Sequence, residues 1–351
     1  MPTDTTSPQP SPWKGEGATV PISVIIPTYN RRESLRLTLD GLSRQTMPMN
    51  SFEVVVVSDG STDGTTEFLT EYAASAPYRF RPIIQENAGP SAARNRAIRE
   101  SAGEVIVLLD DDVEPDPSFL AAHAARHDNI DKLVVIGPML RDPARREPIW
   151  VVWEHLMLRK QYDSWENGAW STAGPHNFYS GNASVRREWI MAVDGFDESL
   201  KRMEDVDLAR RMERECGVRF EYDPRPAGIH RPIRSVESWL AVAEAYGRLD
   251  VVCARTGAGS WDAIRKRYAD RNLATRLLSR AMIAVPALAT PIRSLLMTSA
   301  RIAYACGSTN AAMVALSVVC NLRYLESAGI EMGWDALRRV IDDAPTPATA
   351  P

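Results

Sequence analysis

Short apolar runs alternate with amphipathic segments from Pro21 to about Asp110. The runs at 23–27, 53–58, 81–85 and 104–110 predict strands, because they are short and mostly rich in β-branched residues. The segments between them, 31–45, 62–74 and 91–101, carry apolar residues at helical spacing. Apolar strands that alternate with helices predict a mixed, mostly parallel sheet with helices on both faces, and a ligand crevice at the carboxyl ends of its strands.

The pattern becomes irregular after about Gly137, and we expect a loop-rich stretch where tryptophans crowd residues 150–170. These rings are as consistent with core packing as with stacking on an acceptor sugar. Helical periodicity returns at 204–215, and 235 to about 325 is helical in character almost throughout. The expected organisation is a disordered tail at 1–20, an α/β domain at 21–234 and a helical C-terminal region at 235–345.

Composition excludes several classes of protein. The 351 residues are 44% apolar and 25% charged, as in ordinary globular proteins, and the net charge of −4 does not favour nucleic-acid binding. Four scattered cysteines without a C-x-x-C pair argue against a zinc ribbon and indicate a reducing compartment. The first 20 residues lack the basic and apolar regions of a signal peptide, so we expect a cytoplasmic protein.

Charge is unevenly placed along the C-terminal region. Residues 255–301 hold nine Lys or Arg and two Asp or Glu, and the next 19 residues, 302–320, hold no charge. This order favours a helical hairpin over about residues 281–320 that lies on, or dips into, the cytoplasmic face of an anionic membrane. A soluble helical subdomain and a true membrane span are the alternatives; the five Gly, Ser, Thr or Asn residues within 302–320 weaken the last.

Polar residues follow the predicted strands. Asn30 comes after the first strand, Asp59 after the second, and Asp110, Asp111 and Asp112 after the fourth. Carboxylates this close repel one another unless a cation lies among them, and hard oxygen ligands suit Mg²⁺ or Mn²⁺. A solvated acidic turn is the alternative interpretation.

Other acidic or nucleotide-binding motifs do not match. Glu114 and Pro115 break the haloacid-dehalogenase and EF-hand patterns, and neither G-x-G-x-x-G after the first strand nor a P-loop occurs. His123 and His127 share a helix face without the glutamate of H-E-x-x-H, so we expect them to be surface histidines.

Five ordered motifs resemble glycosyltransferase family 2: ISVIIPTYNRRESL, EVVVVSDGSTDGT, ENAGPSAARNRAI, GEVIVLLDDD and MEDVDLARRM. The resemblance covers about residues 21–230. It implies the GT-A fold, a Rossmann-like α/β sheet, and a nucleotide-diphospho-sugar donor. For donor binding, it implies that Pro27, Tyr29 and Asp59 form the base pocket, that Arg94 contacts ribose or diphosphate, and that Asp111 lies near the ribose.

The same resemblance assigns the chemistry. Asp110 and Asp112 form a D-x-D that holds the metal, with His230 as a further metal-binding or phosphate-facing residue, and Asp205 is the catalytic base. At the start of a helix, Asp205 is expected to stay ionised. One departure, Asp194 in place of a glycine, puts the shape of its loop in doubt.

The expected activity is inverting, metal-dependent transfer of a single sugar. The donor is expected to be UDP-linked and the acceptor to be a hydroxyl of a glycan or lipid-linked molecule, in cell-surface polysaccharide or glycoconjugate synthesis. No Q-x-x-R-W string occurs, which argues against a processive synthase. A catalytically inactive sugar-nucleotide-binding subunit and a sugar-1-phosphate nucleotidyltransferase remain as alternatives.

Overall fold

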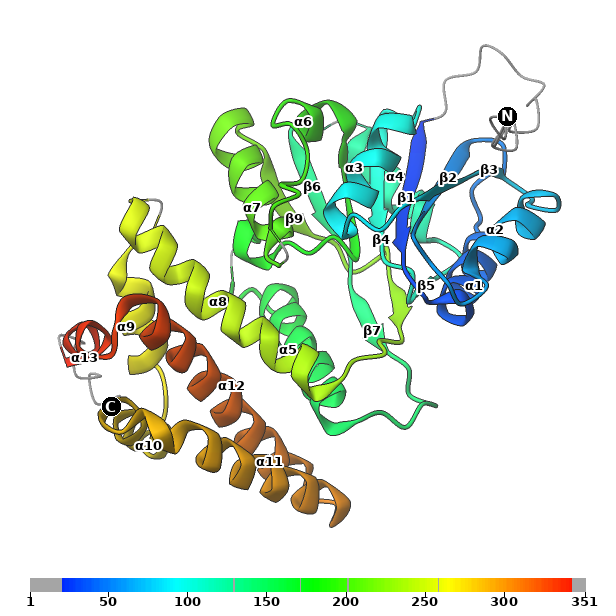
Figure 1. Cartoon of the computed structure of the whole chain (residues 1–351). Coiled ribbons are helices and arrows are strands. Elements are labelled where there is room, and N and C mark those ends of the chain that lie inside the picture. Colours follow the sequence, from blue (N-terminus) through cyan, green and yellow to red (C-terminus); the bar gives the residue numbers. More distant parts are fainter. Residues whose placement is uncertain (1–20, 129, 171, 201, 258, 343–351) are drawn as a thin grey trace, which may run out of the picture. The chain divides into compact units, whose positions relative to one another are not determined.

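The computed structural model describes residues 21–342, except residues 129, 171, 201 and 258 (Figure 1). The chain divides into two compact units, each described here by itself. An α/β unit takes in residues up to 144 and 157–232, and a helical unit takes in 145–156 and the residues from 233 on. The tail expected to be disordered, 1–20, lies outside the described residues.

Seven strands of the α/β unit form one mixed sheet in the order β3-β2-β1-β4-β8-β6-β9. The first four are parallel, and β8 runs antiparallel to both of its neighbours. The mostly parallel sheet predicted from the sequence is thus confirmed. The strands are β1 Ile22–Thr28, β2 Phe52–Asp59, β3 Arg79–Gln85, β4 Val105–Leu109, β6 Leu133–Ile136, β8 Asn182–Arg186 and β9 Arg219–Tyr222.

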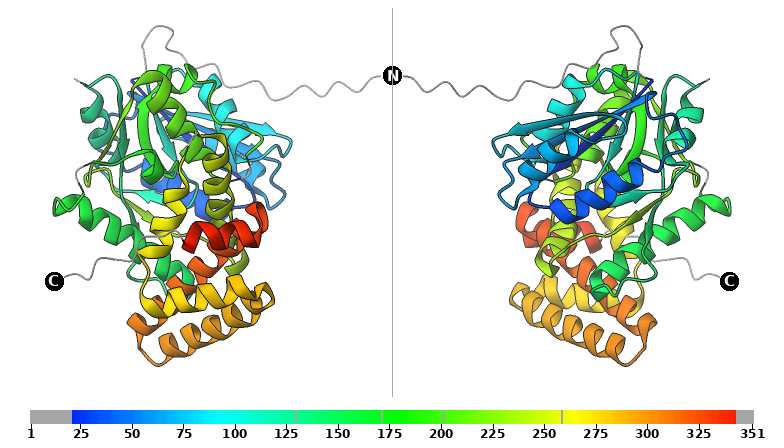
Figure 2. Two further views of the ribbon diagram at one scale, coloured as in Figure 1. Left: turned by 90° about the vertical axis from the view of Figure 1, so that its left-hand side faces the viewer. Right: turned by 90° about the vertical axis from the view of Figure 1, so that its right-hand side faces the viewer.

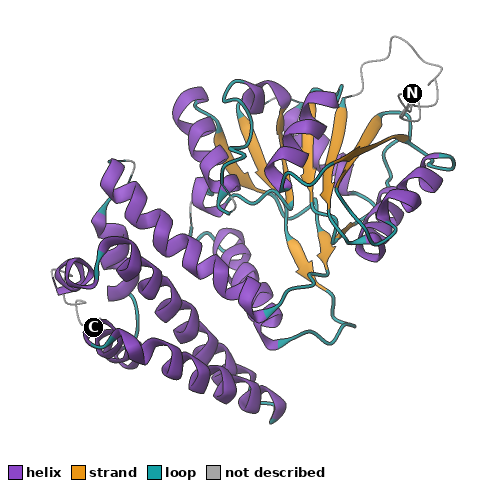
Figure 3. Ribbon diagram, viewed as in Figure 1, coloured by secondary structure: helices purple, strands orange, loops and turns teal. Residues whose placement is uncertain are grey.

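Helices cover both faces of this sheet (Figure 3). One face packs against α1, α2 and α4, and the other against α3, α6 and α7. Neighbouring residues of β1 alternate between the two cores, since strand side chains point to opposite faces: Val24 and Ile26 to one, Ile25 to the other. The helices are α1 Arg32–Leu42, α2 Thr65–Ala73, α3 Pro90–Glu100, α4 Phe119–His127, α6 Arg187–Met191 and α7 Glu204–Arg211, with short turns η1 Pro175–Asn177 and η2 Met212–Cys216.

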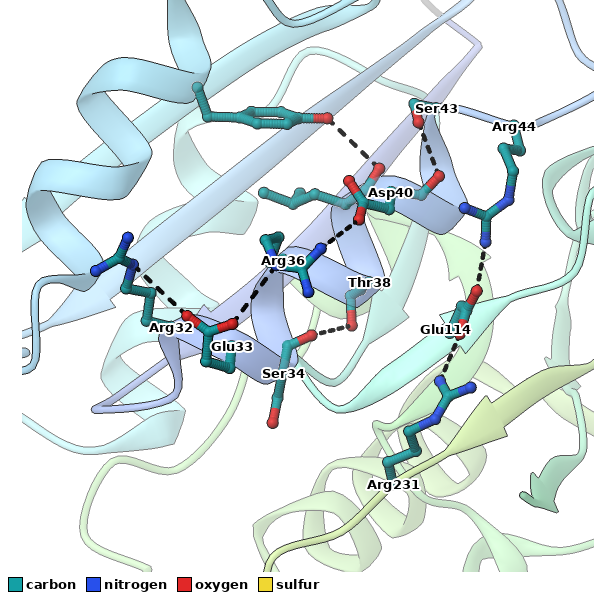
Figure 4. A network of polar contacts seen from close by, with 12 residues as sticks. Arg32, Glu33, Ser34, Arg36, Thr38, Asp40, Ser43, Arg44, Glu114 and Arg231 are labelled. Atoms are coloured by element: carbon teal, nitrogen blue, oxygen red, sulfur yellow. Dashed lines mark hydrogen bonds and ion pairs between the residues drawn. The ribbon is translucent and has the colours of Figure 1, made fainter. Parts of the chain in front are cut away.

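A second, three-stranded sheet of β5 (Val113–Pro115), β10 (Gly228–His230) and β7 (Met139–Arg141) lies next to α1. Gly41 of α1 allows the close approach, because a Cβ there would lie 2.6 Å from Cδ of Pro115. Glu114 of β5 then receives two guanidinium groups, Arg44 from the end of α1 and Arg231 from the residue after β10 (Figure 4). These contacts fix the small sheet, and with it the end of β10.

The expectation of a loop-rich stretch after residue 150 is wrong. Residues Ile149–Glu166 form one helix, α5, whose first half belongs to the helical unit and whose second half belongs to the α/β unit. The tryptophans mainly pack within the protein: Trp153 meets Trp239 edge to face at 5.5 Å between centroids, and Trp165 stacks on Tyr222 at 5.0 Å. Trp170, beyond the helix, is 46% exposed.

The two histidines of α4 are not on the surface, as the sequence analysis expected. His123 and His127 are buried against β8, where each ring has a nitrogen 2.8 Å from the hydroxyl of Ser184. Their helix face packs on the sheet instead of facing water. Burial lowers the pKa of His123 to about 4 and that of His127 to about 3, so both rings are neutral at pH 7.

The helical unit is built around α12. This helix packs against α8 on one side and α11 on another, and α10 and α13 also contact it (Figures 1 and 2). Gly247 of α8 permits the closest approach, because a Cβ there would lie 2.3 Å from the carbonyl oxygen of Tyr324. The helices are α8 Val236–Thr256, α9 Trp261–Ala269, α10 Leu273–Ala284, η3 Pro286–Leu288, α11 Ala289–Ala305, α12 Thr309–Met332 and α13 Trp334–Asp342.

The uncharged segment 302–320 is not one helix. Helix α11 ends at Ala305, the chain turns through Gly307 at φ +79°, and α12 begins at Thr309, so the segment is the tip of a helical hairpin. Within the described residues, α12 is the single helix whose length and composition would allow it to cross a membrane. Most of its apolar window is buried among the other helices, as expected of a core helix.

Candidate active site

The carboxyl ends of β1, β2 and β4 bring the predicted polar residues to one edge of the large sheet. The strand order reverses direction between β1 and β4, where open parallel sheets bind ligands. Asn30 follows β1, and its side-chain oxygen accepts a hydrogen bond from the Thr62 N–H at 2.7 Å. The Asn30 N–H donates to the Ser61 hydroxyl at 3.0 Å, which ties the loops after β1 and β2 together.

Asp59, at the end of β2, organises the loop before α3. Its carboxylate accepts hydrogen bonds from the backbone N–H groups of Ala88 and Gly89 and from the side-chain amide of Gln85, all at 2.8–2.9 Å. Tyr29 stands one position beyond β1, half exposed, and Pro27 lies within β1 beside Val57 of β2. The three residues predicted to form the base pocket therefore come from the neighbouring ends of two paired strands.

Asp111 and Asp112 are buried behind Arg31. The Arg31 guanidinium contacts Asp111 at 3.2 Å and also hydrogen-bonds Asp112, while the Thr28 hydroxyl donates to Asp111 at 2.6 Å. Burial raises the pKa of Asp111 to about 7, despite the opposing effect of Arg31. Burial acts on Asp112 in the same direction, but His230 and Arg31 outweigh it and hold its pKa below the ordinary value.

The small sheet places His230 beside the aspartates. Strand β10 pairs with β5, and the imidazole Nε2 of His230 lies 3.5 Å from Oδ1 of Asp112. Two carboxylates and an imidazole suit Mg²⁺ or Mn²⁺, and the Oδ1 atom of Asp112 is buried without a hydrogen-bond donor, so these residues fit a cation by their chemistry. No group of three His, Cys, Asp or Glu side chains is gathered into a ready-made metal site in the described parts of the chain.

Arg94 connects the aspartates to α7. It projects from α3, nearly buried, and its guanidinium binds Asp110 at 2.9 Å and Glu204 at 3.3 Å. The backbone of Asp110 is also held, because its N–H donates to the carbonyl of Gly181, the residue before β8, at 3.1 Å. The aspartate turn, Asp110–Asp112, is thus connected to the start of α7 by the single guanidinium group of Arg94.

Asp205, next to Glu204, is partly buried in the first turn of α7. Its position at the helix N-terminus predicts that it stays ionised. Instead, burial and the neighbouring charge of Glu204 raise the pKa of Asp205 to about 7. The loss of hydration raises the pKa of this carboxyl group by more than the first turn of the helix lowers it. A carboxyl group with this pKa exchanges protons readily near neutral pH, as a general base must.

Two residues that organise this edge, Thr28 and Arg31, were not among the predicted site residues, and the contact of Glu204 with Arg94 was not predicted. The signal for Arg31 was available, because it directly follows Asn30 at the same strand end and the aspartate triplet requires a nearby cation. Thr28 contacts Asp111, 83 positions away, and Glu204 contacts Arg94, 110 positions away. Contacts over such distances in the sequence cannot be predicted from a local pattern.

A family model described as Glycosyl transferase family 2 matches residues 23–193. An uncharacterized glycosyltransferase, YfnE of Bacillus subtilis (strain 168), is 38% identical over 115 residues, which are 33% of this chain and 29% of that protein. Validoxylamine A glucosyltransferase of Streptomyces hygroscopicus subsp. jinggangensis (strain 5008) is 42% identical over 109 residues, 29% of this chain and 25% of that protein. The similarity thus spans less than a third of these curated relatives.

Among solved structures, the mannosyltransferase PcManGT from Pyrobaculum calidifontis, in complex with GDP-Man and Mn²⁺, is similar with a TM-score of 0.58. The similarity covers 90% of this chain and 87% of that one at 22% sequence identity, so it bears on the fold alone. The expected GT-A fold with a C-terminal helical region is confirmed. The family model matches residues 23–193, which hold β1, β2 and β4 and the turns that follow them, so this part of the chain is a glycosyltransferase family 2 domain.

Proposed function

We propose that this glycosyltransferase moves one sugar from a nucleotide-diphospho-sugar, with inversion at the anomeric carbon, to a hydroxyl of a glycan or lipid-linked acceptor. The observation that carries the proposal is the Arg94 bridge, which brings the carboxylates at the start of α7 toward the aspartate turn. Inversion needs a carboxylate base on the acceptor side and charge compensation on the leaving-group side. Asp205 and the aspartate turn supply the candidates for these two roles.

On the donor side, Pro27, Tyr29 and Asp59 are the proposed base pocket, and Asp111 and Arg94 the proposed sugar and phosphate contacts. Asp110, Asp112 and His230 would hold a divalent cation, Mg²⁺ or Mn²⁺, which would offset the negative charge developing on the leaving diphosphate. The Mn²⁺ and GDP-Man in the similar mannosyltransferase support a divalent cation and a nucleotide sugar. We propose UDP as the nucleotide, with GDP as the alternative.

On the acceptor side, Asp205 takes the proton of the attacking hydroxyl. Its pKa of about 7 divides the population near neutral pH between a form that can accept this proton and one that cannot. Turnover is therefore expected to rise as the pH increases through about 7. The acceptor is expected at the cytoplasmic face of a membrane.

The test has two parts. Thermal stabilisation by a panel of UDP- and GDP-sugars with Mn²⁺ identifies the donor, because a ligand that binds the native state raises the melting temperature. Release of nucleotide from that donor then compares the wild type with Asp205→Asn. The amide keeps the shape of the side chain but cannot take the proton, so turnover is expected to fall roughly 100-fold or more, while donor affinity changes only a few-fold.

Glu204→Gln is the matched control, since it changes the neighbouring carboxylate that binds Arg94. If Asp205→Asn keeps wild-type turnover and Glu204→Gln loses it, Glu204 is the base. If the purified protein binds a nucleotide sugar without releasing nucleotide, the inactive binding subunit becomes the better description. If it binds no nucleotide sugar, both the proposed activity and that alternative are wrong.

A further inference from the structure

Helices α10 and α11 carry a row of exposed apolar side chains. We name this row the outer stripe; it consists of Leu273 (64% exposed), Leu277 (58%), Val285 (49%), Leu288 (38%), Leu295 (69%) and Ile302 (59%). Leu295 and Ile302 are seven residues apart and lie along one side of α11, whereas Val285 and Leu288 belong to the connection between α10 and α11. The stripe is the strongest concentration of exposed aliphatic residues in the described part of the chain.

The outer stripe is distinct from the core face of the same helices. Met282 and Ile283 of α10 and Ala289 of α11 are buried in one cluster with Leu322 and Leu325 of α12. Both helices therefore contribute these residues to the core around α12, and the exposed residues of the stripe are not part of that core. Packing within the helical unit therefore does not explain the stripe.

The sequence around the stripe is basic. From residue 271 to 325 it contains six arginines and neither Asp nor Glu. Three of these arginines are paired with carboxylates from outside that range, Arg280 with Asp342 and both Arg293 and Arg323 with Glu326. Arg271 and Arg276 have no carboxylate within ion-pair distance in the regions that the structure describes. Two arginines without an ion-pair partner therefore lie close in sequence to Leu273 and Leu277 of the stripe.

We propose that the outer stripe docks on the surface of an anionic lipid bilayer. Exposed Leu and Ile side chains would enter the boundary between headgroups and acyl chains, and the arginines would face the anionic headgroups. A second copy of the chain fits this surface less well, because it would bring the same positive charge to the contact. The proposed docking element is α10 and α11, which share residues 281–305 with the hairpin expected from the sequence over residues 281–320.

This proposal rests on the helical unit and is independent of the donor chemistry, so it is tested without substrate. Flotation of the full chain is compared between vesicles of phosphatidylcholine alone and vesicles containing about one-third phosphatidylglycerol. We expect several-fold more protein to float with the anionic vesicles at low salt, and much of it to be released at high salt, which screens the arginines.

The variant Leu295→Glu/Ile302→Glu places two charges in the stripe, at positions exposed enough for the fold to tolerate them. It is expected to lose most of its flotation. Ile330→Glu is the matched control, because Ile330 is 68% exposed but lies near the end of α12, outside the stripe. It is expected to float like the wild type, and all three proteins should show the same thermal unfolding and donor binding.

Three results would overturn the proposal. In the first, the wild type does not float with anionic vesicles. In the second, the double variant floats as well as the wild type. In the third, light scattering shows that the wild type is an oligomer and the double variant a monomer, while flotation is unchanged. The last result would make the stripe a contact between protein chains. Failure of donor binding in every variant would count against the proposed activity and leave the stripe untouched.

Discussion

At the scale of single residues, the site holds its acidic charge with arginines of its own chain. Arg31 contacts Asp111 and Asp112, and Arg94 contacts Asp110 and Glu204. A carboxylate that already binds a guanidinium must exchange it, or share it, to bind a divalent cation. Arg31 is 35% exposed at its side chain, so it has room to leave, whereas Arg94 is nearly buried.

Because Arg31 is the more exposed of the two arginines, Arg31→Gln tests whether its guanidinium competes with a divalent cation for Asp112. Removing the guanidinium leaves the buried aspartates without their nearest positive charge, so the variant should be less stable than the wild type without metal. Mn²⁺ should then raise the melting temperature of the variant more than that of the wild type, and bind several-fold more tightly in a Mn²⁺ titration.

Arg44→Gln is the control for Arg31→Gln. Arg44 also pairs with a carboxylate at this edge, Glu114, but does not contact the aspartate turn. Its response to Mn²⁺ should match that of the wild type. An identical Mn²⁺ shift in Arg31→Gln would mean that the guanidinium and the cation do not compete.

The buried histidines predict a second residue-scale effect, on stability against pH. Their ordinary pKa of 6.5 falls to about 4 for His123 and about 3 for His127 in the native state. Below pH 6.5 the unfolded chain therefore takes up protons that the native chain does not, and the native state loses stability as the pH falls. The loss is on the order of 2 kcal/mol per histidine between pH 6.5 and 4.5.

The variant His127→Gln keeps a hydrogen-bonding group near Ser184 and removes one titrating ring. The difference in unfolding free energy between variant and wild type, measured in urea across this pH range, should become more favourable to the variant as the pH falls. His176→Gln is the control, because His176 is exposed. Parallel curves for the wild type and His127→Gln would show that the ring titrates alike in both states.

The sequence located the aspartates but not their partners. Strand ends can be read from apolar periodicity, so Asn30, Asp59 and Asp110–Asp112 could be placed at one edge in advance. The burial of His123 could not be, because two histidines on a helix face look alike whether that face meets water or a sheet. The pKa of Asp205 was equally hidden, since it depends on burial and not on sequence position.

At the scale of elements, α5 is the helix that the sequence pattern did not predict, and its packing explains why. Its first half buries Ile149 and Val152 among α8, α11 and α12, and its second half buries Tyr162 in the α/β unit. The buried face therefore changes along the helix, and no single apolar stripe at a period of 3.6 residues marks it. The shorter helices α1 and α3 serve one core each, and they were predicted within a few residues.

The packing of α8 against α12 depends on the absence of a side chain at Gly247. Alanine in a helix is favoured over glycine by about 1 kcal/mol, but a Cβ at this position would lie 2.3 Å from the Tyr324 carbonyl oxygen. That contact is with backbone, so α8 and α12 must separate, and overpacking costs about 1–3 kcal/mol or more. The destabilisation from the steric clash is larger than the stabilisation from the higher helix propensity of alanine. Gly247→Ala is therefore expected to lower the melting temperature of the helical unit.

Hydrogen exchange in α8 and α12 is the measurement that localises this effect, because exchange should accelerate there and not in β1 or β2. Gly174→Ala is the control, since Gly174 has ordinary backbone angles and no heavy atom within 4 Å of the added Cβ position. If Gly247→Ala were as stable as the wild type, the approach of α8 to α12 would have to be looser than described.

At the scale of the whole molecule, the division into units has a practical consequence. All the predicted donor-binding residues precede 233, which suggests that a chain ending at Ser235 would suffice for donor binding. Such a chain would lose α8 to α13 and leave Ile149, Val152 and Trp153 of α5 without their packing partners. We expect it to aggregate, as measured by size exclusion with light scattering.

The same shortened chain with these three residues replaced by polar ones is the informative comparison. It should remain monomeric and bind the nucleotide sugar as the full chain does, because none of the three is a proposed donor contact. A shortened wild-type chain that stays monomeric would show that the first half of α5 does not depend on the helical unit.

The central position of α12 also sets an order of events during synthesis. The helix on which α8, α10 and α11 pack spans residues 309–332, so it leaves the ribosome after all of them. The 76 residues from Thr256 to Met332 take roughly 4–15 s to translate at about 5–20 residues per second. During that interval the apolar face of α8 is exposed, and those of α10 and α11 become exposed in turn, before α12 is complete and covers them. We therefore expect a chaperone that binds nascent chains to bind this protein at its helical unit.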